Sequence, residues 1–305
     1  MRLLGSPVIL SAGRVYCDLV FAGLDAPVVM GREVFADALQ VCTGGGAFIS
    51  AAYLSALGQK VGLLGVLPAE PFSGLVQADL AASAIHPYCT VAPGRDAQLT
   101  AAIVGAVDRA FITRRVGRAV PQAMIDGLPP ARHLHIGELT TALEHPDLIT
   151  AARSRGMTIS LDCGWDETSL ARRDLGSVIA SVDLFLPNEN EAEALMLAGT
   201  SLAPRLATVI KRGADGATCI TDDGDSMTVS AQPVTVVDTT GAGDAFNAGF
   251  LSAWCDGQTL DEALALGAAC GAVAVSRLGG ATNLPDLRNL AASHGHHEPL
   301  RQMAE

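Results

Sequence analysis

Basic and aromatic side chains are scarce in this sequence. The 305 residues include 20 Lys or Arg against 32 Asp or Glu, which gives a net charge of −12, and only 4% are aromatic. Binding to a nucleic-acid backbone requires concentrated positive charge, so this balance argues against nucleic acid as the main partner. There is also no run of about 18 uninterrupted apolar residues, so we expect no membrane-spanning helix.

Cysteine pairs with the spacing of a zinc or redox site are also missing. The seven cysteines are scattered, at positions 17, 42, 89, 163, 219, 255 and 270. Such a pattern fits reduced thiols in the cytoplasm better than disulfides or zinc ligands. The N-terminal segment 1–20 has the pattern of a strand and a loop and does not resemble a secretion signal. We therefore expect a cytoplasmic protein.

Short β-rich runs alternate with helical stretches along the chain. The apolar runs 158–161, 184–186 and 207–210 are separated by helical segments, and this rhythm predicts a mostly parallel sheet with helices on both faces. No repeat or linker interrupts the pattern, so residues 1–305 are expected to form a single α/β domain with only the last dozen residues loose. Ligands should bind at the carboxyl ends of the strands.

The stretch VVDTTGAGDAFNAGF, residues 236–250, places a carboxylate directly after a glycine-rich turn. The glycines let backbone amides approach an anion, and the start of the following helix adds unpaired N–H groups and the positive end of its dipole. Asp244 is placed to accept a proton from a hydroxyl that attacks a phosphoryl group bound there. The segment therefore predicts an anion hole with a base beside it.

The same turn has a structural alternative, because Gly-Ala-Gly is also an ordinary strand-to-helix connection. The longer string resembles the C-terminal signature of the ribokinase/PfkB family of carbohydrate kinases. The residues that carry the resemblance are Asp238, Thr239, Gly241, Ala242, Gly243, Asp244 and Gly249. The resemblance implies a ribokinase-like α/β fold and an ATP-dependent kinase in which Asp244 is the base and Gly241, Ala242 and Gly243 form the anion hole.

Two segments, about 14–42 and 97–120, fit the βα rhythm less well and alternate like exposed β-structure. Members of the family carry a small β-sheet lid built from two such insertions, which closes over the sugar and often contributes to dimer contacts. The resemblance therefore implies a lid and a homodimer formed through it. Closure would exclude water from the reaction. A peripheral hairpin without a gating role is the alternative.

The acceptor site is implied by residues near the N-terminus. Asp18 matches the family carboxylate that binds acceptor hydroxyls, since a carboxylate can accept hydrogen bonds from two adjacent hydroxyls. In TGGGAFISAAYLSALG, residues 43–58, the resemblance places Gly44 and Gly45 close to the sugar. The family usually has Asn where this chain has Ile49, so the identity of the acceptor stays open.

Further motifs imply the nucleotide site. Asn188 and Glu191 in PNENEAE resemble the family's N-x-x-E element, in which Glu191 acts on Mg²⁺ through water, although a helix cap explains the same residues. The residues that the resemblance assigns to ATP are Asn188, Glu191, Lys211, Gly213, Gly216, Gly279 and Asn283, with Arg212 as the alternative to Lys211. It also places Asp238 and Thr240 where many members bind potassium.

Other polar residues favour structural roles. His133 and His135 share one face of a strand, but two ligands do not make a zinc site. Arg109, Arg114, Arg115 and Arg118 could bind a phosphorylated acceptor, yet a solvated lid face explains them better. Trp165 could stack on a substrate ring or simply pack.

The pattern as a whole predicts an ATP- and Mg²⁺-dependent kinase that phosphorylates a primary hydroxyl of a sugar or sugar-like molecule. A nucleoside acceptor is the alternative within the family, because nucleoside kinases share its fold and signature. A catalytically silent sensor of sugars or nucleotides is a more remote alternative, and the intact Asp244 argues against it.

Overall fold

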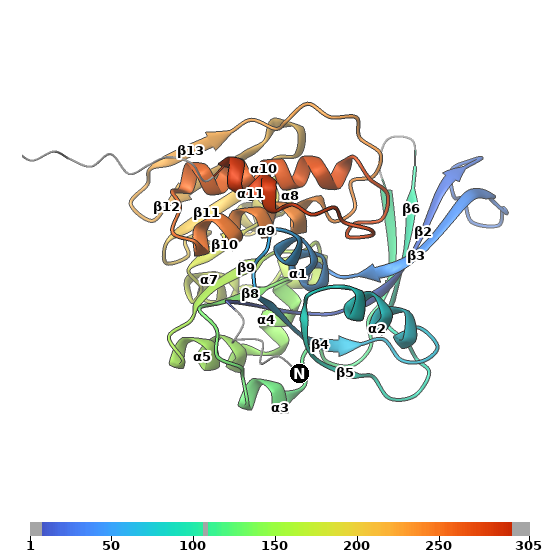
Figure 1. The fold of residues 1–305 in the computed structure, drawn as a ribbon, viewed down its shortest axis with the longest axis horizontal. Coiled ribbons are helices and arrows are strands. Elements are labelled where there is room, and N and C mark those ends of the chain that lie inside the picture. The colour runs from blue at the N-terminus through green and yellow to red at the C-terminus, as the bar shows by residue number, and fades with distance from the viewer. Residues whose placement is uncertain (1–7, 106–108, 295–305) are drawn as a thin grey trace, which may run out of the picture.

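A nine-stranded sheet forms the centre of the computed structural model, which describes residues 8–105 and 109–294 (Figure 1). In spatial order its strands are β13 (Ser226–Val229), β12 (Ala217–Thr221), β11 (Ala207–Lys211), β10 (Leu184–Leu186), β9 (Thr158–Asp162), β8 (His133–Ile136), β1 (Ile9–Ala12), β4 (Val61–Leu67) and β5 (His86–Val91). Neighbours pair in parallel from β5 to β11, and only β12 and β13 run antiparallel at one edge. The predicted mostly parallel sheet is confirmed.

Helices cover both faces of this sheet, as the alternating pattern predicts. On one face, a first hydrophobic cluster forms between the sheet and the helices α1 (Gly46–Ala56), α2 (Ser73–Ala82), α9 (Ala242–Cys255), α10 (Leu260–Val275) and α11 (Arg288–His294). On the other face, a second hydrophobic cluster forms between the sheet and the helices α3 (Gln122–Asp126), α4 (Leu139–Glu144), α5 (Pro146–Ser154), α6 (Glu167–Leu170), α7 (Leu175–Ala180) and α8 (Glu189–Leu197). Ile9 belongs to the first cluster and Leu10 to the second, because successive side chains of a strand point to opposite faces.

A separate four-stranded sheet projects from one side of the molecule (Figure 1). Its order is β3 (Ala36–Gly44), β2 (Tyr16–Leu24), β6 (Leu99–Val104) and β7 (Arg109–Arg114). Strands β2 and β6 pair in parallel, and the two outer pairs are antiparallel. The strands come from the two segments that fitted the βα rhythm least. That this sheet closes over a substrate stays a prediction, and we call it the lid sheet.

The sequence also predicted that no helix spans a membrane and that the C-terminal tail is loose. Within the part of the chain that the structure describes, no helix has the length and apolar character needed to cross a bilayer. The loose tail expected at the C-terminus lies outside the described residues from position 295 onward.

Candidate active site

The glycine-rich turn forms the start of α9, as the sequence predicts. Gly241 is the N-cap residue with φ 73°, a left-handed conformation that a residue with a Cβ atom rarely adopts. No side chain caps this end of α9, and Ala242 N donates to Thr239 O at 3.3 Å. The first turn of a 14-residue helix is therefore available to an anion.

The Asp244 carboxylate lies where the starts of α9 and α1 meet. A Cβ atom on Gly46 would come within 2.7 Å of Asp244 Oδ1 and of Gly137 O, so only a glycine leaves room for the carboxylate. Ser50 Oγ donates to the Asp244 backbone carbonyl at 3.1 Å. These contacts place the carboxylate of α9 against the amino end of α1 and the carboxyl end of β8.

The environment of Asp244 disfavours its ionised form. Burial and the neighbouring carboxylate of Asp162 raise its pKa to about 8, while the Lys211 ammonium group opposes the shift and Glu191 adds to it. A carboxylate with a pKa near the working pH is a better proton acceptor than one with an ordinary value. The electrostatics therefore suit Asp244 to the task of a general base.

Lys211 supplies positive charge directly behind the turn. A Cβ atom on Gly243 would lie 3.4 Å from Lys211 Nζ. Nζ donates to Asp162 Oδ1 at 2.9 Å and to Asn247 Oδ1 at 3.1 Å, and Asn247 Nδ2 donates to Asp162 Oδ2 at 2.7 Å. Burial would lower the pKa of Lys211, but the carboxylates of Asp162 and Glu191 outweigh burial and raise it. The group is therefore an ammonium ion at neutral pH.

This network contains residues that the sequence analysis did not assign. Asp162 ends β9 and Asn247 is three residues after Asp244 on the same helix, so both side chains reach the turn. Of the two cations considered for the phosphates, Lys211 is the one beside Gly243, whereas Arg212 Nη2 is 3.4 Å from Asp215 O. A polar residue directly after the apolar run 158–161 was the available signal for Asp162.

Substitution of Lys211 tests this electrostatic arrangement. In Lys211→Met the cation that lowers the pKa of Asp244 is gone, so the pKa rises further. The acidic limb of the kcat/KM profile, below which Asp244 is protonated, should then move to higher pH. Lys60→Met removes an exposed lysine and serves as the control. A profile of Lys211→Met that superimposes on those of the control and wild type would contradict the arrangement.

The carboxylate predicted to bind the acceptor lies on the lid sheet. Asp18 on β2 is 7% exposed, and its Oδ1 has no hydrogen-bond partner among the described residues. Burial raises its pKa to about 7, against a hydrogen bond from Thr100. A Cβ atom on Gly44 would come within 1.8 Å of Asp18 Oδ2, so this glycine makes room for the carboxylate. An unpartnered buried oxygen is costly, which suits a group that awaits a ligand.

Two other residues of the expected acceptor site are Gly45, which lies against the backbone of Arg14, and Ile49, which lies beside the glycine-rich turn. Gly45 has φ 96°, and a Cβ atom there would meet Arg14 O at 2.3 Å, so it forms the tight entry into α1. The Ile49 side chain is 4% exposed and packs against Gly241 and Gly280. The structure therefore brings Ile49 to the glycine-rich turn at the start of α9, which we call the phosphate turn after its predicted role, and the expected role of Ile49 toward the acceptor stays untested.

Asn188 and Glu191 form the capping box of α8. Glu191 N donates to Asn188 Oδ1 at 2.9 Å, and Asn188 N donates to Glu191 Oε2 at 2.8 Å. The helix-cap interpretation is thus correct, and it leaves room for a second role. Burial and the Asp162 carboxylate raise the pKa of Glu191 to about 7, opposed by Lys211. Asn188 also forms a parallel β-bridge with Lys211, which places the capping box beside the hydrogen-bond network of Lys211.

The remaining residues assigned to ATP lie on loops near the turn or the sheet edge. Gly213 and Gly216 have positive φ in the connection from β11 to β12, and a Cβ atom on Gly216 would meet Val229 O at 1.9 Å. Gly279 and Asn283, with φ 82° and 48°, shape the loop after α10. Gly279 N donates to the Asp238 carboxylate, which ties this loop to the phosphate turn.

The potassium site implied by Asp238 and Thr240 fits this donor set poorly. Asp238 Oδ1 accepts from Thr240 N at 2.9 Å and from Thr240 Oγ1 at 2.7 Å, and Oδ2 accepts from Gly279 N at 2.9 Å. The carboxylate is 2% exposed, and these three hydrogen bonds occupy most of its lone pairs, so little of it is left for a cation. We therefore assign no step to potassium.

The other polar candidates have structural partners. His133 Nε2 and His135 Nδ1 both lie within 2.9 Å of Ser160 Oγ, and the described residues contain no cluster of metal-ligating side chains. Of the lid arginines, Arg114 pairs with Asp96, and Arg118 bonds to Glu144 O and His145. Arg115 pairs with Asp166 at 2.6 Å, and Arg109 bonds to Thr239. The last two contacts join the lid segment to the start of α6 and to the turn before α9. Trp165 is 56% exposed.

Comparison with known proteins agrees with this geometry. The model of the pfkB family of carbohydrate kinases matches residues 32–287. An ATP-dependent ribose-1-phosphate kinase of Halopiger xanaduensis is 30% identical over 89% of this chain and 93% of its own, and a cytidine kinase of Thermococcus kodakarensis is 29% identical over 82% and 93%.

Solved structures show the same fold. The Arabidopsis thaliana ribokinase complexed with ribose and ATP superposes with a TM-score of 0.76, covering 95% of this chain and 98% of its own at 19% identity. The fold prediction from the sequence is confirmed. The chain belongs to the pfkB family of carbohydrate kinases and is an ATP-dependent phosphotransferase.

Proposed function

We propose that the protein transfers the γ-phosphoryl group of ATP to a primary hydroxyl of a sugar or sugar-like molecule. The observation that carries this proposal is the Asp244 carboxylate, with its raised pKa, in the first turn of an uncapped helix that has the Lys211 ammonium group behind it. Asp18 supplies a second buried carboxylate with an unpartnered oxygen for acceptor hydroxyls. A base, an anion site and a hydroxyl-binding group are the parts that this reaction requires.

In the proposed reaction, Asp244 accepts the proton of the acceptor hydroxyl as its oxygen bonds to the γ-phosphorus. The bond from that phosphorus to the bridging oxygen breaks, and ADP leaves with the electron pair. The amides of Ala242, Gly243 and Asp244, with Lys211 behind Gly243, stabilise the negative charge on the phosphoryl oxygens. Positioning and electrostatic stabilisation are the main contributions of a protein to such a transfer.

The residues near the turn fit a magnesium ion that is bound largely by water and phosphate. Glu191 is 4% exposed, and its Oε2 already accepts from Asn188 N, so its carboxylate would act on Mg²⁺ through water. Bound there with ATP, Mg²⁺ supplies positive charge to the phosphates.

The use of ATP as the donor and the seven free cysteines also support a cytoplasmic location.

A nucleoside is the second candidate for the acceptor. The cytidine kinase relative favours this alternative, and Ile49, which replaces the usual Asn of the family, keeps it open. The ribose-1-phosphate kinase relative adds a phosphorylated sugar to the compounds worth testing.

The experiment is acceptor-dependent ADP release from ATP and Mg²⁺ across ribose, fructose, 2-keto-3-deoxygluconate, fructose 6-phosphate, ribose 1-phosphate, adenosine, cytidine and pseudouridine. We expect one strong responder that carries a primary hydroxyl and belongs to the sugars. A strong response to a nucleoside alone would replace the sugar with the second candidate, and binding of ATP without turnover of any compound would favour the silent sensor.

We also infer that the lid sheet joins two copies of the chain. Register places Val41, Leu19, Ala101 and Ile112 opposite one another across its four strands. Val41 is 38% exposed and Ile112 is 66% exposed, which is a large apolar surface for one side of a small sheet. Light scattering should therefore give a dimer that Ile112→Arg converts to a monomer. A wild-type monomer at micromolar concentration would contradict the inference.

A further inference from the structure

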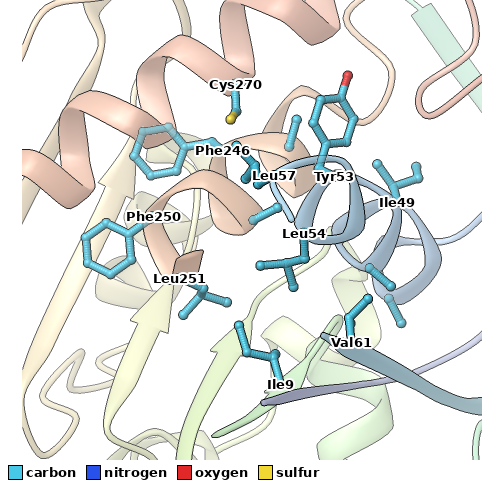
Figure 2. Close-up of a cluster of buried hydrophobic side chains, with 14 of the residues drawn as sticks. Ile9, Ile49, Tyr53, Leu54, Leu57, Val61, Phe246, Phe250, Leu251 and Cys270 are labelled. Atoms are coloured by element: carbon cyan, nitrogen blue, oxygen red, sulfur yellow. The ribbon is translucent and has the colours of Figure 1, made fainter. Parts of the chain in front are cut away.

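One apolar side chain bridges the two loops behind the phosphate turn. A Cβ atom on Gly241 would lie 3.1 Å from Ile49 Cγ2, and one on Gly280 would lie 3.3 Å from Ile49 Cδ1. Ile49 Cδ1 thus lies beside both the start of α9 and the loop after α10, and Cγ2 lies beside the start of α9. Figure 2 shows it projecting from α1, away from Leu54 and Ile9 in the same hydrophobic cluster.

The same two loops are joined by a buried hydrogen bond. Gly279 N donates to Asp238 Oδ2 at 2.9 Å, while Oδ1 of the same carboxylate accepts two hydrogen bonds from Thr240. The loop after α10 therefore turns an N–H group toward the carboxylate. A cation bound between these loops would require oxygen atoms there instead.

We propose that Ile49 and the hydrogen bond from Gly279 to Asp238 hold the phosphate turn in its working position without a monovalent cation. The inference rests on the proposed function, and it makes Ile49 a positioning residue that acts through Gly241 on the transferred phosphoryl group. It has two consequences: turnover is independent of potassium, and shortening Ile49 affects phosphoryl transfer more than acceptor binding.

The first test compares wild-type turnover in potassium, sodium and tetramethylammonium chloride at equal ionic strength. The acceptor is the compound that responds most strongly in the panel. We expect kcat values that agree within about twofold, because no free energy of cation binding enters the assembly of the turn. Activation by potassium beyond about twofold would overturn the proposal.

The second test is a matched pair of variants. Ile49→Val removes Cδ1, which lies beside both Gly241 and Gly280, and keeps Cγ2, which lies beside Gly241 alone. Ile9→Val removes the same methyl group from the same cluster at β1, and Ile9 is also fully buried. We expect both variants to lose thermal stability to a similar, small extent. Ile49→Val alone should lower kcat by about three- to tenfold and leave the acceptor KM unchanged.

The outcomes separate a positioning role from a packing role. Equal kcat values for the two variants, or a change confined to the acceptor KM in Ile49→Val, would overturn the role of Ile49. Calorimetric binding of the Mg²⁺ complex of AMP-PNP in potassium and in tetramethylammonium needs no acceptor. Equal affinities there would support cation independence even if no acceptor were turned over, a result that would count against the proposed function alone. Tighter binding in potassium would overturn cation independence.

Discussion

Asp244→Asn should lose nearly all turnover, with kcat lower by about 10²- to 10⁴-fold, which is the usual contribution of a positioned general base. The amide has the size of the carboxylate but cannot take the proton of the acceptor hydroxyl. The contacts that hold the start of α9 remain, because Ser50 Oγ donates to the backbone carbonyl of residue 244 and Gly46 still leaves room for the side chain. We therefore expect a wild-type melting temperature and nearly unchanged Mg²⁺-ATP affinity.

Asp256→Asn is the matched control for this variant. Asp256 follows the last turn of α9 and accepts a hydrogen bond from Gln59 Nε2 at the surface, so it shares the helix but not the site. Steady-state kinetics of the control should match the wild type. Near-normal turnover of Asp244→Asn would remove Asp244 from the role of base and would redirect attention to Asp162 and Glu191.

Asp18→Ala should have the second-largest effect, expressed in the acceptor and not in ATP. A carboxylate that binds two hydroxyls makes two charge-assisted hydrogen bonds, each worth about 1.5–3 kcal/mol, so kcat/KM for the acceptor should fall by about 10²- to 10⁴-fold. The KM for ATP should stay the same.

Because burial holds the pKa of Asp18 at about 7, the wild-type acceptor affinity should rise as the pH increases through that value.

Asp37→Ala provides the control on the same lid sheet. Asp37 lies on β3 and is exposed, so its removal takes away a carboxylate without touching the buried pocket. Initial rates against acceptor concentration for the two variants give the comparison. An unchanged acceptor KM and kcat in Asp18→Ala would show that Asp18 does not bind the acceptor.

The parts of the fold that local patterns determine could be predicted from the sequence. The apolar runs at 158–161, 184–186 and 207–210 became β9, β10 and β11, because buried parallel strands are apolar throughout. The turn at Gly241 was recognisable from its glycines and the carboxylate after them. The exposed β-structure of segments 14–42 and 97–120 was anticipated from their alternation, and the separate sheet from the family resemblance.

Interactions between distant segments could not be read in the same way. The network of Asp162, Lys211 and Asn247 joins β9, β11 and α9, and no spacing along the chain indicates that these three side chains meet. Ile49 was placed near the acceptor by resemblance, whereas its contacts depend on how α1 packs on the turn. Local motifs thus predicted the elements, and tertiary packing decided which side chains meet at the glycine-rich turn.

The most direct test of the account is the fate of the terminal phosphoryl group. The wild-type protein is incubated with γ-labelled ATP, Mg²⁺ and the acceptor that responds in the panel, and the label is followed to the product, with Asp244→Asn beside it. We expect the label on a primary hydroxyl of the acceptor in the wild type and almost none in the variant. Label released only as inorganic phosphate, or equal transfer by both proteins, would contradict a kinase that uses Asp244 as its base.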